Sequence, residues 1–97
     1  MENFISVEEL KEKLSQHEPL HLLDVRTLEE HQHFNIGGQL IPIQELAFRL
    51  NEIPTDKPII VYCRSGQRSQ MAVDMLAQVG IDAQNLLGGM IAWQQML

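Results

Sequence analysis

The chain has 97 residues, of which 44% are hydrophobic and 21% charged, and its net charge is −6. These values predict one globular domain over residues 1–97, since the chain is long enough for one hydrophobic core and too short for two. The acidic charge argues against a nucleic-acid partner, and the absence of any apolar stretch of about 18 residues argues against a membrane span.

Short apolar runs alternate with amphipathic segments along the chain. A short apolar run predicts a strand, and apolar residues at a spacing of three or four predict a helix. In chain order, the pattern predicts a strand at 4–5, a helix at 7–15, a strand at 20–25, a short helix capped by residue 27, a strand at 39–41, a surface helix at 43–53, a strand at 58–62, a helix at 70–79, a strand at 85–87 and a helix at 90–97.

Polar caps and glycines mark the ends of the first two predicted helices. Ser6 with Glu9 has the capping-box form that opens a helix. Thr27 with Glu30 repeats this form, and we expect residues 37–38, both glycine, to end the helix that it opens.

Strands that alternate with helices predict an α/β fold. Each crossover helix must pack back on the sheet, so we expect a central parallel sheet of four or five strands with helices on both faces. Functional sites of such sheets lie beyond the carboxyl ends of the strands. Asp24, Arg26 and Cys63 all lie at that end of a predicted strand.

The segment from Cys63 to Ser69 connects a predicted buried strand to a helix. The free N–H groups and the positive dipole end of a helix N-terminus favour an anion, and Arg64 and Arg68 add two positive charges. Both effects shift a thiol toward thiolate, so Cys63, the only cysteine, is placed as a nucleophile would be. One cysteine cannot form an internal disulfide, which makes a reducing cytoplasm the expected compartment.

Four groups of residues share the order and spacing of one known family. They are Leu23-Asp24-Val25-Arg26 with Glu30, then Ile36 and Gly38, then Ile60 to Ser69, and then Leu87-Gly88-Gly89 with Trp93. With these motifs the chain resembles a single-domain rhodanese, a thiosulfate sulfurtransferase. The family usually has Gly-His-Ile-Pro-Gly-Ala where residues 34–39 of this chain are Phe-Asn-Ile-Gly-Gly-Gln, and this difference leaves partner choice and pocket shape open.

The residues of the loop suit sulfur chemistry. A thiolate at Cys63 can attack the outer sulfur of thiosulfate, expel sulfite and keep the sulfur as a persulfide. The backbone N–H groups from Arg64 to Ser69 can hold the anionic terminal sulfur, and Gly66 permits the turn. Arg64 and Arg68 suit a dianionic donor. With Cys63 as the catalytic residue, the predicted substrate-binding residues are Arg64, Ser65, Gly66, Gln67, Arg68 and Ser69.

The resemblance implies sulfur transfer without a metal or an organic cofactor. The acceptors it leaves open are cyanide, a thiol such as glutathione, thioredoxin and a sulfur-carrier protein. Asp24 and Arg26 are expected to support the site as a paired acid and base. His31 and His33 are expected on the solvated surface, because residues two apart do not share a helix face for a metal. Ser69 is expected to bond the persulfide or to cap the following helix.

Two other functions remain open. The first is a non-enzymatic rhodanese-like module that binds a partner protein, against which the intact Cys63 and its cationic loop argue. The second is a cysteine phosphatase or arsenate reductase. Those enzymes use a Cys-x5-Arg loop, whereas Cys63 and Arg68 form the shorter Cys-x4-Arg loop, which the resemblance implies is sized for one sulfur atom. With Arg64 directly after the cysteine, the loop resembles that of the family members that use thiosulfate. The members that use mercaptopyruvate usually have glycine at this position.

Overall fold

Five parallel strands form one sheet in the order β1-β5-β4-β2-β3, in a computed structural model that describes residues 2–96. The strands are β1 (Phe4–Ile5), β2 (His21–Asp24), β3 (Gln39–Leu40), β4 (Ile59–Tyr62) and β5 (Gln84–Leu86). β4 lies at the centre and pairs with both β2 and β5. Asp24 is in register with Tyr62, so β2 and β4 end side by side, one residue before Cys63. The prediction of a parallel sheet of four or five strands is confirmed.

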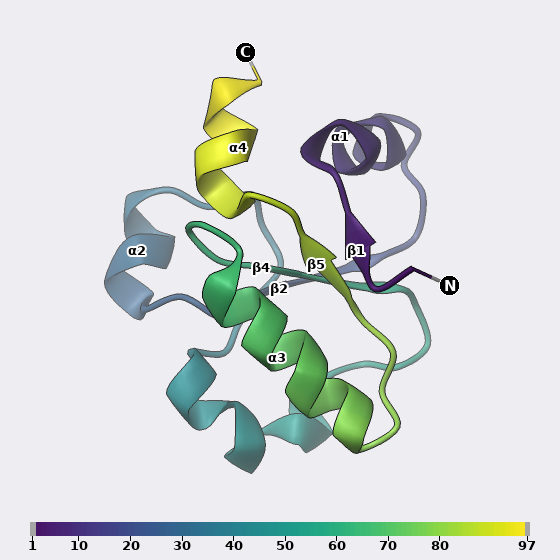
Figure 1. Ribbon diagram of the computed structural model, residues 1–97, viewed down its shortest axis with the longest axis vertical. Helices are drawn as coiled ribbons and strands as arrows, with labels where there is room; N and C mark the ends of the chain where they lie inside the picture. The colour runs from purple at the N-terminus through teal and green to yellow at the C-terminus, as the bar shows by residue number, and fades with distance from the viewer. Residues whose placement is uncertain (1, 97) are drawn as a thin grey trace.

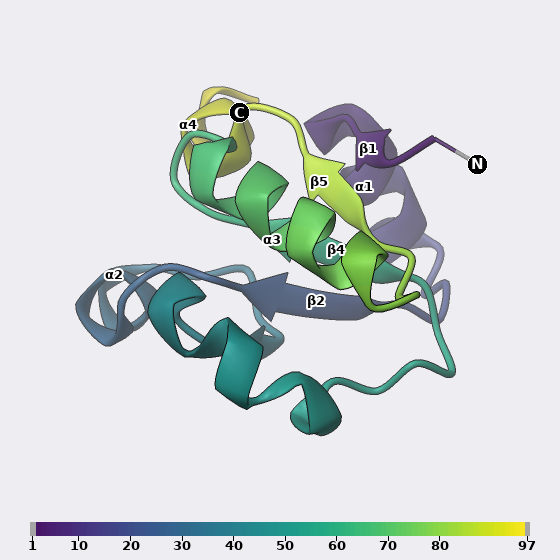
Figure 2. The ribbon, with the colours of Figure 1, turned by 60° about the horizontal axis from the view of Figure 1, so that its bottom comes forward.

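Helices cover both faces of this sheet. They are α1 (Val7–Ser15), α2 (Leu28–His33), α3 (Gln67–Gln78), α4 (Gly89–Gln95) and two 3-10 segments, η1 (Ile43–Phe48) and η2 (Leu50–Glu52). Figure 1 shows α1 and α4 above the sheet in the view and α3 with the 3-10 segments below it. α2 lies beyond the arrowhead of β2 (Figure 2), which is the carboxyl end of the sheet. No helix within residues 2–96 is both long and apolar enough to cross a membrane.

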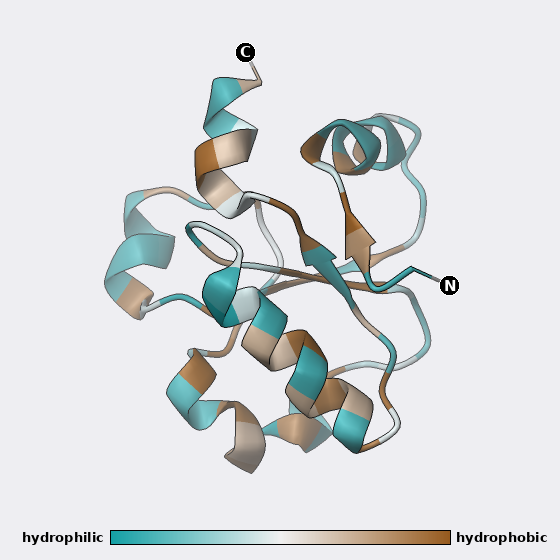
Figure 3. Ribbon diagram, viewed as in Figure 1, coloured by the Kyte–Doolittle hydropathy of each residue, from teal (hydrophilic) through white to brown (hydrophobic). Residues whose placement is uncertain are grey.

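The two faces of β4 belong to two separate hydrophobic clusters. Ile59 and Val61 pack in one cluster with residues of α3 and the 3-10 segments, and Ile60 and Tyr62 pack in the other with residues of α1 and α4. All four side chains are buried, which explains why the sequence of β4 is apolar without alternation. The ribbon coloured by hydropathy shows β4 as hydrophobic and most of α2 as hydrophilic (Figure 3).

The end of α2 and the form of the segment at 43–53 differ from the sequence predictions. α2 ends at His33, before the glycines expected to end it, because Phe34 is extended and Arg26 donates a hydrogen bond to its carbonyl. The segment at 43–53 is two 3-10 turns, in which the side chains at Ile43 and Leu46, three residues apart, align toward the core.

α3 begins at Gln67, three residues earlier than predicted, and its N-cap is Gly66 in the left-handed region at φ 103°. Arg68 and Ser69 therefore lie in the first turn of the helix, and the alternative that Ser69 is the N-cap is wrong. α4 ends at Gln95, and Leu97, the predicted end of that helix, lies outside the described residues.

Candidate active site

The Cys63 sulfur is surrounded by hydrogen-bond donors from the turn that follows β4. Cys63 is 1% exposed and packs in the cluster that includes Val61. The backbone N–H of Gly66 lies 3.0 Å from Sγ, and that of Ser69 lies 3.4 Å away. The Ser69 hydroxyl oxygen is 3.2 Å from the same sulfur. Three polar groups from the turn and from the start of α3 therefore converge on one buried atom.

These contacts decide the acidity of the thiol. Burial raises the pKa of Cys63, but the Ser69 hydroxyl and the backbone N–H groups of Ser69, Gly66 and Ser65 lower it by more. The net pKa lies below the ordinary thiol value, as the loop sequence predicted. The largest of these lowering effects come from neutral donors of the turn, and Arg68 lies near enough for its charge to interact with Cys63 as well.

The N-terminus of α4 fixes the backbone of Cys63 from the other side. The N–H groups of Met90 and Ile91 donate to the carbonyls of Cys63 and Arg64 at 2.9 and 3.0 Å. Gly89 has φ 56°, and a Cβ built on it would lie 2.5 Å from the Cys63 carbonyl oxygen. The Gly-Gly-x-x-x-Trp motif thus has a structural reason, since only glycine permits this close approach.

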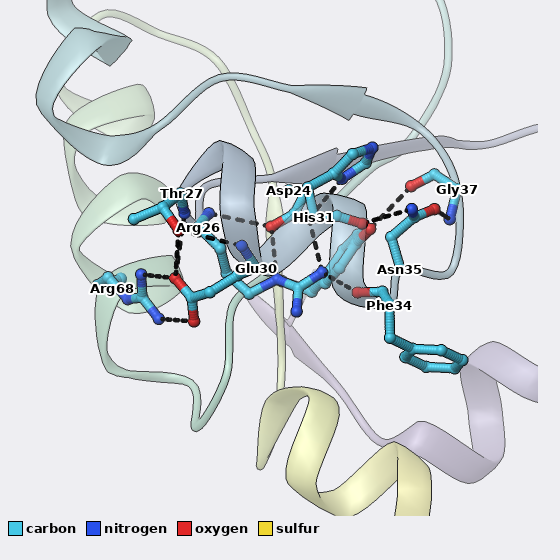
Figure 4. A network of polar contacts seen from close by, with 10 residues as sticks. Asp24, Arg26, Thr27, Glu30, His31, Phe34, Asn35, Gly37 and Arg68 are labelled. Carbon is cyan, nitrogen blue, oxygen red and sulfur yellow. Dashed lines mark hydrogen bonds and ion pairs between the residues drawn. The ribbon is translucent and has the colours of Figure 1, made fainter.

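The two arginines of the loop have different surroundings. Arg64 is exposed, as are Ser65 and Gln67, and the ion pairs found within residues 2–96 do not include it. Arg68 instead donates to both carboxylate oxygens of Glu30 at 2.7 and 2.9 Å (Figure 4). This guanidinium holds the pKa of Glu30 at about 2 against the opposing effect of burial. The charge of Arg68 is therefore matched, and that of Arg64 faces solvent.

Asp24 is the centre of a second polar network beside the site, drawn in Figure 4. It is 0% exposed and accepts hydrogen bonds from Arg26 Nε at 2.9 Å and from a terminal nitrogen of Arg26 at 2.8 Å. Arg26 also donates to the Phe34 carbonyl at 2.7 Å, and it lies over the Tyr62 ring at 5.4 Å from the centroid. The Asp24 and Arg26 pair expected from the sequence is present, and it holds the segment after α2 against the sheet.

His31 belongs to this network and not to the solvated surface. Its Nδ1 lies 2.8 Å from Asp24 Oδ2, and its side chain is 21% exposed. The prediction for His31 was wrong because α2 turns this side chain toward the buried end of β2, whereas His33 is exposed as predicted. Within residues 2–96 no three His, Cys, Asp or Glu side chains gather as metal ligands would.

One residue of the site escaped the sequence reasoning. Asn85 of β5 is 4% exposed and contacts Gly66, Ser69 and Gln70 through its side chain. The sequence did contain a signal for Asn85, because it is a polar residue within a strand of a sheet that is covered on both faces. Buried polar groups are almost always hydrogen-bonded, so such a residue is expected to have specific partners. Phe34, in the segment that departs from the family pattern, is 42% exposed near Arg26.

Comparison with known proteins agrees with this architecture. The model of the family described as "Rhodanese-like domain" matches residues 6–96, and the chain belongs to this family. A sulfurtransferase of Allochromatium vinosum is 40% identical over 95 residues, covering 96% of this chain and 89% of that protein. A crystal structure of a rhodanese-like domain protein from Staphylococcus aureus has a TM-score of 0.86 and 37% identity, covering 96% of this chain and 91% of that one.

A longer relative contains the same unit. The chain is 34% identical over 110 residues to an adenylyltransferase and sulfurtransferase of Arabidopsis thaliana, covering 95% of this chain and 24% of that protein. These relatives support sulfur transfer as the general activity of the chain.

Proposed function

We propose that the protein is a thiosulfate sulfurtransferase that carries sulfane sulfur as a persulfide on Cys63. The observation that supports this most strongly is the convergence of the Gly66 and Ser69 N–H groups on a buried sulfur whose pKa lies below its ordinary value. A thiolate at this position is both nucleophilic and stabilised by fixed dipoles. Neither a metal nor an organic cofactor is required for the proposed reaction.

In the first half-reaction, the Cys63 thiolate attacks the outer sulfur of thiosulfate. A new S–S bond forms to Sγ, the S–S bond of thiosulfate breaks, and its electron pair leaves with sulfite. The terminal sulfur of the resulting persulfide carries the negative charge. The N–H groups of the turn from Arg64 to Ser69 are proposed to hold this sulfur, because inward-pointing amides form an anion site.

In the second half-reaction, a nucleophilic acceptor attacks the terminal sulfur. The persulfide S–S bond breaks, and its electron pair returns to Sγ as a thiolate, which the Gly66 and Ser69 donors again stabilise. Cyanide and a small thiol are suitable acceptors, and so are thioredoxin and a sulfur-carrier protein. We propose a reducing compartment such as the cytoplasm, where the single thiol stays available.

The two loop arginines are proposed to act differently on the donor. Arg64 is exposed, and its charge can attract the sulfonate end of thiosulfate and bind it. Arg68 is committed to Glu30, so its proposed role is to hold the first turn of α3 in place. Ser65 and Gln67 are exposed beside Arg64 and are proposed to contact the donor.

Intact-protein mass spectrometry tests the persulfide. The protein is incubated briefly with thiosulfate and then with cyanide, with Cys63→Ser as the control. The proposal expects a gain of one sulfur atom that cyanide removes and that the control never shows. A folded protein whose thiol alkylates but gains no sulfur from thiosulfate would contradict thiosulfate as the donor. Failure with persulfide donors as well would favour a binding module.

A further inference from the structure

A chain of side-chain hydrogen bonds leads from the surface of α3 to the Cys63 sulfur, and its direction is fixed by the outermost group. Asp74 is a carboxylate and accepts only, so Gln70 Nε2, 3.0 Å away, donates to it. The amide oxygen of Gln70 is then the atom that faces Asn85, and it accepts from Asn85 Nδ2 at 3.2 Å. The Gly66 carbonyl accepts from the same Nδ2 at 3.2 Å. Both amide protons of Asn85 are therefore committed.

This orientation leaves Asn85 Oδ1 facing the Ser69 hydroxyl. An amide oxygen accepts only, so the single hydroxyl proton of Ser69 points at Asn85. The lone pairs of the Ser69 oxygen consequently face Cys63 Sγ, 3.2 Å away, where they accept the S–H of the thiol. The resting network thus has one donor and one acceptor at every step from Asp74 to Cys63.

Ionisation of Cys63 disturbs this arrangement, because a thiolate needs donors. If the Ser69 hydroxyl turns its proton to the sulfur, it forms the contact that lowers the pKa of Cys63, but Asn85 Oδ1 then loses its donor in a position that is 4% exposed. If the hydroxyl proton of Ser69 stays directed at Asn85 Oδ1, the thiolate faces a lone pair of the Ser69 oxygen. Either outcome gives up one buried hydrogen bond, which carries a free-energy cost.

We propose that Asn85 is a positioning residue that competes with the Cys63 sulfur for the Ser69 hydroxyl proton and so sets the balance between thiol and thiolate. This role of Asn85 concerns the same site as the proposed sulfur transfer, and its effect on the reaction rests on that proposed function. Cys63 must attack in one half-reaction and leave in the other. A more acidic thiol is a better leaving group and a poorer nucleophile, so an intermediate acidity serves both steps.

The charged groups near Cys63 are separate from this competition. They are Arg64 of the loop, Arg68 of α3 with Glu30 of α2, and Asp24 with Arg26 after β2, whereas α4 carries no charged residue. Within residues 2–96 the side chain of Asn85 hydrogen-bonds none of these charged groups, and its partners are Gly66, Ser69 and Gln70. Substitution of Asn85 therefore changes the hydroxyl proton and leaves the ion pairs as they are.

The test is a double-mutant cycle read by the pH dependence of thiol alkylation, which needs no sulfur donor. In the Ser69 background, Asn85→Ala should lower the alkylation midpoint by about one pH unit, because the hydroxyl proton becomes free for the thiolate. In a Ser69→Ala background the same change should leave the midpoint where it is. Gln84→Ala is the matched control, because this half-buried amide on the same strand donates to the Glu2 and Phe4 carbonyls and not to Ser69.

An equal shift in both backgrounds would show that Asn85 acts through the shape of the turn and would overturn the proposal, as would no shift or an upward shift. If Asn85→Ala does not fold, NMR of the wild type decides the question. The side-chain carbonyl carbon of Asn85 should titrate at the alkylation midpoint, and Ser69→Ala should abolish that titration. A titration of the same size in Ser69→Ala would overturn the proposal.

The persulfide cycle supplies a second readout. Above both midpoints, Asn85→Ala should slow loading from thiosulfate and speed unloading to cyanide, each by about threefold, since nucleophilicity and leaving ability change oppositely with acidity. Slowing of both steps would indicate distortion and contradict the proposed competition. If the wild-type protein does not take up sulfur, the proposed function is rejected but the role of Asn85 is not. The alkylation experiment tests that role without any sulfur donor.

Discussion

Glu30 binds Arg68 with both carboxylate oxygens, at 2.7 and 2.9 Å, and so joins α2 to the first turn of α3 across 38 residues of sequence. Glu30 also accepts from the backbone N–H of Thr27, so one carboxylate both caps its own helix and fixes the neighbouring one. The pairing leaves Arg64 as the loop arginine whose charge is open to a donor.

The Glu30 and Arg68 pair should make the free energy of unfolding depend on pH in the acidic range. The folded pKa of Glu30 is about 2, below its usual value of 4.5, so the pair stabilises the fold above pH 4.5 and this contribution is lost as pH falls toward 2. Glu30→Gln keeps the capping box. It should cost about 1 kcal/mol at pH 7, after allowance for solvent screening, and nothing near pH 2. Urea unfolding at both pH values measures this, and an equal loss at both would contradict it.

Removal of Arg64 should impair use of thiosulfate and leave the fold intact. Arg64→Ala is expected to lower kcat/KM for thiosulfate about tenfold, the effect of losing one charge-assisted hydrogen bond, without a change in the unfolding midpoint. Lys57→Ala, an exposed cation in the loop before β4, at the opposite end of that strand from Cys63, is the matched control. Unchanged KM and kcat in Arg64→Ala would mean that this side chain does not contact the donor.

Substitutions of Gly89 and Gly80 test whether the close approach of α4 to Cys63 requires glycine, with Gly80 as the control. Both have positive φ, but a Cβ at Gly80 meets nothing within 4 Å, whereas one at Gly89 meets the Cys63 carbonyl. Gly80→Ala should cost about 1 kcal/mol from backbone strain alone. Gly89→Ala should cost more and should also raise the alkylation midpoint of Cys63. Chemical denaturation and alkylation measure the two effects, and equal costs with an unmoved midpoint would refute the steric argument.

Asp24 should be the least replaceable carboxylate of the protein. Asp24→Asn leaves the buried Arg26 without its charged partner, and the loss of one member of a buried pair costs about 3 kcal/mol or more. Asp56→Asn, at an exposed position, serves as the control and should be neutral. Both are measured by denaturant unfolding. A loss below 1 kcal/mol for Asp24→Asn would show that the pair with Arg26 contributes little to the fold.

The strand β4 and the position of Cys63 at its end could be predicted from sequence because their signals are local. Residues 58–62 are a short apolar run, and Cys63 follows it directly, so the order of strand, turn and helix fixes where the sulfur lies. The start of α3 could not be predicted in the same way. Its N-cap is Gly66 in the left-handed region, without a side-chain cap to identify it.

The sequence also could not predict which side chains pair with one another. Arg68 and Glu30 each had several residues of opposite charge available, and only the folded position of α2 relative to the first turn of α3 selects one pair. The same holds for His31, whose contact with Asp24 depends on how α2 is rotated against the end of β2. The polar position at Asn85 was visible, but its link to Ser69 requires β5 to lie beside β4.

The hydrogen bonds from Met90 and Ile91 to the backbone of Cys63 and Arg64 bear on the order of synthesis. A ribosome produces Cys63 well before it produces β5 and α4, and a nascent chain that stops short of Asn85 presents a thiol without these neighbours. Such a thiol has the reactivity of any unfolded cysteine. If the proposed function is correct, the capacity to carry sulfur on Cys63 arises late in translation, when the last strand and helix join the sheet.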